Sequence, residues 1–162
     1  MIILKGDLLE TPFEIIAHQV NCRGKMGSGV AKQIKERYPV VYEDYARALK
    51  CHGANAMFGM GQIVNQDDHT IFNLFGQYNY GYDGEKYTNY KALENALDDA
   101  ICKYRYERNI SLEIQLTIAI PYKIGCDRGG GDWKIVKQML ENIERDYNVV
   151  FVAYKLDQNS AH

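Results

Sequence analysis

Hydrophobic residues along the chain form short apolar runs that alternate with stretches of helical spacing. The apolar runs predict strands at 1–4, 13–20, 112–120 and 149–153. The segments 62–65 and 70–75 predict a hairpin that turns at Asp67-Asp68. Helical spacing predicts helices at 30–37, 40–50, 90–108 and 133–144. In the last of these the inward-facing residues are expected to be Ile135, Val136, Met139, Leu140 and Ile143.

This alternation of strands and helices indicates an α/β protein. Several strands lack polar alternation, which is typical of a sheet covered by helices on both faces. A chain of 162 residues without repeats or a linker fits one domain. We expect that domain to span residues 1–156 and the tail, 157–162, to be frayed.

Composition narrows the function classes. With 19 basic and 21 acidic residues the net charge is −2, which argues against non-specific nucleic-acid binding and requires any anion to be held locally. No apolar run is long enough to cross a membrane, and MIILKGD has no signal-peptide pattern, so a cytoplasmic protein is expected. The 4 cysteines lack CxxC spacing, so reduced thiols are expected, and neither a metal nor a cofactor is predicted.

Two glycine-rich loops carry the candidate chemistry. The first lies in HQVNCRGKMGSGVAK, residues 18–32, between a predicted strand and a helix, and the second is GCDRGGG, residues 125–131. Such loops either cradle phosphate with backbone N–H groups or simply turn the chain tightly. Neither matches the P-loop or the dinucleotide fingerprint. If their strands are neighbours, both loops line one cleft, which suits a ligand with two phosphates.

The ordered set KGDL, HQVNC, MGSGVA and the segment from Pro121 to Trp133 resembles a macrodomain over nearly the whole chain. The segment NCRGKMGSGVAKQIKERYPVVYEDY, the string NLFGQ and the tyrosine-rich loop after it are most similar to stand-alone macrodomains of the ADP-ribose 1''-phosphate phosphatase type. The resemblance implies a three-layer α/β/α sandwich with a mixed, mostly parallel central sheet. It also implies a cleft for ADP-ribose and, as we expect, a monomer.

The resemblance also assigns residues to that cleft. Asp7 matches the acidic residue that accepts the adenine amino group, with Leu8 beside it, and Tyr154 matches a residue placed against adenine. Asn21 matches the asparagine at the distal ribose. The loop beside the diphosphate and distal ribose corresponds to Met26, Gly27, Ser28, Gly29, Val30 and Ala31. The phosphate loop opposite corresponds to Ile124, Gly125, Cys126, Asp127, Arg128, Gly129 and Gly130.

The same resemblance implies hydrolysis of ADP-ribose 1''-phosphate to ADP-ribose and phosphate, without a metal. Two alternatives stay open: a glycohydrolase that removes ADP-ribose from modified protein or nucleic acid, and a reader that binds ADP-ribose without catalysis. The glycohydrolase branch uses a lysine where this chain has Gln77, and an aspartate where it has Gly129. These departures favour the phosphatase.

The predicted catalytic residues are His18, Asn21, Asp127 and Asp132. His18 suits an acid, base or nucleophile near neutral pH, or it is a hydrogen-bonded core histidine. Asp132 either orients water or, as the pattern slightly favours, caps the following helix. Asp127 lies in the phosphate loop, where a carboxylate is unfavourable unless protonated or turned away.

The remaining candidates have ordinary alternatives too. Arg128 either neutralises phosphate or is solvated. A Cys-x5-Arg phosphatase is excluded because Ser28 and Asp132 stand where the arginine would be, so Cys22 and Cys126 are expected to pack. The tyrosines that could stack on a base or form a lid are Tyr78, Tyr80, Tyr82, Tyr87 and Tyr90.

Overall fold

The computed structural model describes residues 1–81 and 83–156, so Tyr82 and the tail predicted to be frayed lie outside the described residues. Within them the elements, in chain order, are β1 (Ile2–Lys5), η1 (Leu8–Glu10), β2 (Ile15–Gln19), α1 (Gly29–Arg37), α2 (Pro39–His52), α3 (Ala54–Met57), β3 (Gly61–Asn65), β4 (Thr70–Leu74), α4 (Tyr90–Arg108), β5 (Leu116–Pro121), α5 (Trp133–Tyr147) and β6 (Val149–Lys155). None of the described helices has the length and hydropathy needed to span a membrane.

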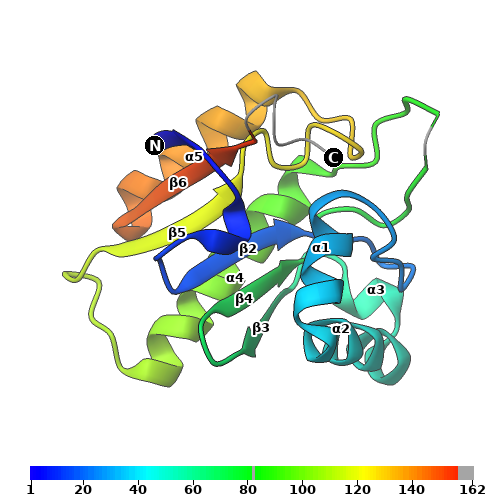
Figure 1. Cartoon of the computed structure of the whole chain (residues 1–162), viewed down its shortest axis with the longest axis horizontal. Coiled ribbons are helices and arrows are strands. Elements are labelled where there is room, and N and C mark those ends of the chain that lie inside the picture. The colour runs from blue at the N-terminus through cyan, green and yellow to red at the C-terminus, as the bar shows by residue number, and fades with distance from the viewer. Residues whose placement is uncertain (82, 157–162) are drawn as a thin grey trace.

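The described strands form one six-stranded sheet in the order β1-β6-β5-β2-β4-β3 (Figure 1). Neighbours from β1 to β4 pair in parallel, and β3 alone runs antiparallel, against β4. The predicted mixed, mostly parallel sheet is therefore confirmed. Because β2 and β5 are adjacent, the two glycine-rich loops that follow them start side by side at one edge of the sheet.

Helices cover both faces of this sheet (Figure 1). On one face α4 and α5 pack over Ile15 and Ala17 of β2, and on the other α1, α2 and α3 pack around Ile16. Consecutive residues of a strand point to opposite faces, so one apolar run supplies both cores. The three-layer α/β/α sandwich expected from the resemblance is confirmed.

The strand predicted at 112–120 begins only at Leu116. The Arg105 guanidinium donates to the carbonyls of Ser111 and Ile114, at 2.6 and 2.9 Å, and this holds the preceding residues in a turn. Ile114 is consequently 58% exposed instead of buried. The apolar pattern of this segment could not reveal a turn that depends on a side chain of the preceding helix, α4.

Three further details differ from the sequence-based expectation. The short helices η1 and α3 were not predicted, because each spans a single turn. Ile135, predicted to face inward, is 46% exposed, whereas the other four predicted inward residues of α5 are buried. β1 is apolar yet exposed along its length, because it lies at the edge of the sheet.

Gly61 marks the closest approach of β3 to α4, and we predict that Gly61→Ala destabilises the fold. A Cβ at this position would meet the Ala96 carbonyl and lie 2.7 Å from Ala100 Cβ and 2.8 Å from Ala100 N. Relieving this overlap requires a backbone shift, so the free energy of unfolding should fall by about 2 kcal/mol, measured by urea denaturation.

The matched control is Gly27→Ala, where a Cβ meets nothing within 4 Å. Its free energy of unfolding should stay within about 0.5 kcal/mol of the parent value. Equal stability of the two variants would show that β3 and α4 are not in this tight contact.

Candidate functional site

A cleft of about 430 Å³ opens at the carboxyl edge of the sheet. It is lined by residues that follow or end each of the five parallel strands, among them Asp7 after β1, Asn21 after β2, Gln77 after β4, Gly125 after β5 and Tyr154 of β6. This volume is in the range of small-molecule sites. Open α/β sheets bind ligands at this edge, so the cleft is the candidate functional site.

The first glycine-rich loop supplies one wall. Gly27, Ser28, Gly29, Val30 and Ala31 all line the cleft, and α1 begins within this stretch. The first N–H groups of a helix have no partner within the helix and carry a partial positive charge. They make this wall suitable for an anionic group.

Asn21 holds the first loop in shape. Its Oδ1 accepts from Arg23 N at 2.9 Å, and its Nδ2 donates to the Lys25 carbonyl, also at 2.9 Å. The buried Tyr45 hydroxyl lies 2.7 Å from the Asn21 carbonyl and 2.8 Å from Oδ1. Asn21 lines the cleft as predicted, and its amide is largely engaged in positioning the loop.

The second loop supplies the opposite wall, with Ile124, Gly125, Asp127, Arg128 and Gly129 lining the cleft. Thr88, in the segment before α4, fastens this loop. The Thr88 hydroxyl donates to the Gly125 carbonyl at 2.6 Å, and its N–H donates to the Gly129 carbonyl at 2.8 Å. The two predicted phosphate loops therefore do line one cleft.

Gln77 occupies the position at which the resemblance expected a lysine in glycohydrolases. It is 8% exposed, its Nε2 donates to the Asn79 carbonyl at 2.8 Å, and its Oε1 accepts from Gln19 Nε2 at 2.7 Å. Gln19 Nε2 also donates to Thr88 Oγ1, at 2.8 Å. The Gln77 amide thus joins the Gln19 side chain to the Asn79 backbone at the base of the cleft.

His18 lies at the end of β2 and is 1% exposed, yet it lines the cleft. Its Nε2 lies 2.6 Å from Asn73 Oδ1, and its Nδ1 has no hydrogen-bond partner among the described residues. Burial lowers the pKa of His18 from 6.5 to about 4, so the imidazole is neutral near pH 7. His18 is therefore a buried, hydrogen-bonded histidine. It also lines the cleft, as a role as acid, base or nucleophile would require.

The far end of the cleft is lined by Asp7, Leu8 and Tyr154, as predicted. Asp7 Oδ1 accepts from Leu9 N at 3.0 Å, which caps η1. The Tyr154 hydroxyl bonds to Thr11 Oγ1 at 2.8 Å, so the end of β6 is tied to the segment after η1. Asp7 is therefore both a cap and a cleft residue.

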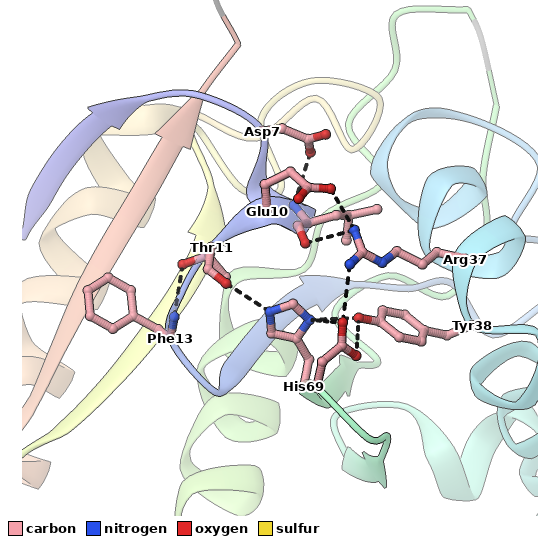
Figure 2. Close-up of polar contacts among 9 residues, drawn as sticks. Asp7, Glu10, Thr11, Phe13, Arg37, Tyr38 and His69 are labelled. Carbon is pink, nitrogen blue, oxygen red and sulfur yellow. Dashed lines mark hydrogen bonds and ion pairs between the residues drawn. The ribbon is translucent and has the colours of Figure 1, made fainter.

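A polar cluster behind this end holds the segment that carries Asp7 (Figure 2). Arg37, at the end of α1, donates to the Leu9 carbonyl and to Glu10 Oε1, both at 2.9 Å. The buried His69 ring bonds through Nε2 to the Thr11 carbonyl at 2.9 Å. These contacts fix the backbone of residues 7–11 against α1 and the β3–β4 turn, and neither Arg37 nor His69 lines the cleft.

Four predicted site residues do not line the cleft. Met26 is 2% exposed and packs in the core beneath the first loop. Cys126 packs against the other core, and Gly130 approaches Glu85 and Lys86 instead of the cleft. Asp132 caps α5, accepting from Lys134 N at 2.9 Å, which is the interpretation that the sequence slightly favoured.

Cys22 and Cys126 pack against the two cores, as expected. Burial raises the pKa of Cys22 and of Cys126 to about 11, so both thiols are protonated and poor nucleophiles.

Within residues 1–81 and 83–156, no group of three or more His, Cys, Asp or Glu side chains is arranged to hold a metal ion. Of the tyrosines proposed as a lid, Tyr80 is the one that lines the cleft within the same ranges.

Sequence reasoning missed several cleft residues, above all the lysines. Lys25, Lys123 and Lys155 line the cleft together with Arg128, whereas the acidic lining residues in the described chain are Asp7 and Asp127. This excess of cations is local, since the whole chain carries −2. Their positions just after β2, after β5 and at the end of β6 could have identified them once the strand order was known.

The fold and this two-walled cleft define a macrodomain. A family model described as Macro domain matches residues 17–140, so the chain belongs to the macro domain family.

The proteins similar to this chain include some named as DNA ADP-ribosyl glycohydrolases and some named as ADP-ribose 1''-phosphate phosphatases. A DNA ADP-ribosyl glycohydrolase of Thermus aquaticus is 29% identical over 142 residues, covering 85% of this chain and 36% of that protein. An ADP-ribose 1''-phosphate phosphatase of Meyerozyma guilliermondii is 30% identical over 105 residues, covering 60% of this chain and 59% of its own. Among solved structures, the macrodomain of Mycobacterium tuberculosis DarG superposes with a TM-score of 0.73 at 29% identity, covering 94% of this chain and 97% of its own. This chain thus spans about a third of the glycohydrolase's length.

The buried His18 predicts a pH-dependent stability. Its pKa is about 4 in the folded protein and near 6.5 when unfolded, so between these values the unfolded chain binds more protons. Stability should be full above pH 6.5 and fall by about 3 kcal/mol as the pH drops to 4.

His18→Asn, compared with the parent by urea denaturation at each pH, should lack this part of the slope. The matched control His52→Asn changes an exposed histidine at the end of α2 and should keep it. Parallel pH profiles for the parent and His18→Asn would show that His18 titrates normally in the fold.

Proposed function

We propose that the cleft binds ADP-ribose 1''-phosphate and that the protein hydrolyses it to ADP-ribose and phosphate. The observation that carries this proposal is His18, a neutral imidazole at the floor of the cleft with one unpartnered ring nitrogen. The family membership supports the ligand class, and the phosphatase among the relatives supports the reaction.

The lining of the cleft supports one orientation of the ligand. Adenine would lie at Asp7 and Tyr154, where a carboxylate and an aromatic ring stand together. The diphosphate would lie between the N-terminus of α1 and the second loop, where backbone N–H groups and the cations can offset its charge. The distal ribose and its 1''-phosphate would then reach Asn21 and His18.

The reaction in this geometry is attack of water on phosphorus. The new bond joins the water oxygen to phosphorus, and the bond between phosphorus and the 1''-oxygen breaks. His18 Nδ1 takes the water proton and returns it to the departing 1''-oxygen. Although its pKa is about 4 in the empty cleft, a neighbouring phosphate dianion favours the protonated imidazole and so raises its basicity. The loop N–H groups and lining cations stabilise the charge on the transferring group.

Gln77 weighs against the lysine-dependent glycohydrolase mechanism. An amide is not a nucleophile, and both of its ends are hydrogen-bonded within the cleft floor. Hydrolysis through water and His18 needs no group at this position.

The second candidate is removal of ADP-ribose from a modified macromolecule. The relatives named DNA ADP-ribosyl glycohydrolases favour it, because they match 83–85% of this chain. Asp127, which lines the cleft, would then have to position the attacking water. This mechanism would proceed without the lysine.

The test is phosphate release from ADP-ribose 1''-phosphate in the presence of EDTA. We predict chelator-resistant release, and His18→Asn should lower kcat by about 100-fold or more because it removes the proton acceptor. KM and the affinity for ADP-ribose in calorimetry should stay within a few-fold, since the walls of the cleft are unchanged.

His52→Asn is the matched control and should keep full turnover. No phosphate release by the parent protein would contradict the phosphatase. Release of ADP-ribose from ADP-ribosylated DNA would then support the second candidate. Binding of ADP-ribose without either activity would indicate a non-catalytic ADP-ribose-binding protein.

A further inference from the structure

A row of polar side chains crosses three adjacent strands, from the half-buried Gln62 through the buried Asn73 to the buried His18. His18 of β2 is in register with Asn73 of β4, and Asn73 is in register with Gln62 of β3. His18 Nε2 lies 2.6 Å from Asn73 Oδ1, and Asn73 Nδ2 donates to Gln62 Oε1 at 3.0 Å. Gln62 Nε2 donates to the backbone carbonyl of Asp44, in α2, at 3.0 Å.

The far end of this row sets the direction of every hydrogen bond in it. A backbone carbonyl can only accept, so Gln62 must present its NH2 group to Asp44 and its oxygen to Asn73. Asn73 must then donate its NH2 to Gln62 and turn its oxygen toward His18. A neutral histidine facing an oxygen must carry its proton on Nε2.

We propose that Asn73 and Gln62 are positioning residues that fix neutral His18 as the Nε2–H tautomer, so that His18 presents an unprotonated Nδ1 to the cleft and enters the reaction as a proton acceptor. Neither Asn73 nor Gln62 lines the cleft. Their effect on the reaction therefore passes through the imidazole.

Nδ1 is the ring nitrogen that this tautomer leaves free to accept. It is buried and has no partner among the described residues, and a buried acceptor without a partner is unfavourable. A ligand hydroxyl or the attacking water would supply the missing donor. That part of the inference rests on the proposed function, whereas the tautomer belongs to the empty protein.

The charged surroundings of His18 come from both sides. At the outer end of the row, the Asp44 carboxylate pairs with Arg47 at 2.8 Å, so it is engaged outside the core. On the cleft side the charged lining residues of the described chain are Asp7, Lys25, Lys123, Asp127, Arg128 and Lys155. Burial keeps the pKa of His18 low enough for a neutral ring near pH 7, which is the condition for a single tautomer.

The tautomer can be measured directly by ¹⁵N NMR of the imidazole in the unliganded protein at pH 7. The parent protein should show a protonated Nε2 and an unprotonated Nδ1 for His18. A protonated Nδ1 with a bare Nε2 would overturn the inference without reference to any activity.

The matched pair Gln62→Leu and Gln62→Glu tests the positioning. Leucine removes the acceptor for Asn73, so the Asn73 amide can turn and His18 should lose its single tautomer. Glutamate keeps an oxygen opposite Asn73 Nδ2 and should retain the Nε2–H form. Gln66→Leu, in the β3–β4 turn where the Gln66 side chain donates to the neighbouring Asn65 carbonyl, should leave His18 unchanged.

Activity gives a second readout. In Gln62→Leu, kcat for phosphate release should fall in proportion to the fraction of Nδ1–H tautomer, with KM unchanged. An unaltered tautomer in folded Gln62→Leu protein would overturn the positioning role. The expected tautomers together with no phosphate release would overturn the proposed phosphatase and leave the hydrogen-bond row standing.

Discussion

The structure depends on the placement of β2 between β4 and β5, which buries the strand from both sides and brings its carboxyl end to the middle of the cleft. A strand alternates its side chains, so the last two residues of β2 must point to opposite faces. Here they are His18 and Gln19, and each begins a separate hydrogen-bonded row. The row on the α2 side fixes a ring nitrogen, and the row on the α4 side fixes the second glycine-rich loop.

Both rows end on backbone carbonyls, at Asp44 on one side and at Asn79 and Gly125 on the other. Because such oxygens only accept, the orientation of every amide between them is determined by the fold itself. Buried polar groups are costly unless satisfied, so these rows also discriminate against alternative packings of the cleft floor. These hydrogen bonds hold the cleft floor in place beside the buried anchors of the two loops, Met26 and Ile124.

Local periodicity predicted the α/β sheet and its two helical layers, and the glycine-rich stretches after strands predicted the two loops. Most of the lining residues were implied by the resemblance to macrodomains. The sequence could not predict that 112–115 form a turn, since that turn depends on Arg105 from another element. The sequence also could not predict that Met26 and Cys126 pack against the cores, because residue spacing does not show which loop residues face the cleft and which face the core. The lysines were missed for a related reason: Lys123 and Lys155 become neighbours only once β5 and β6 are paired.

Relatives of this chain are named as ADP-ribosyl glycohydrolases and as phosphatases, and the residue after β4 bears on which of these reactions this cleft could perform. A lysine after β4 would extend a nucleophile toward the distal ribose, whereas Gln77 uses its whole amide to join Gln19 to the Asn79 carbonyl. Replacing one by the other changes both the reactive group and the support of the second loop, because Gln19 also bonds to Thr88. Two cleft-lining side chains, His18 at Nδ1 and Gln19 at Oε1, have a buried polar atom without a partner among the described residues, and the imidazole is the basic group of the two. A proton acceptor suits water attack at phosphorus, where no protein nucleophile is required.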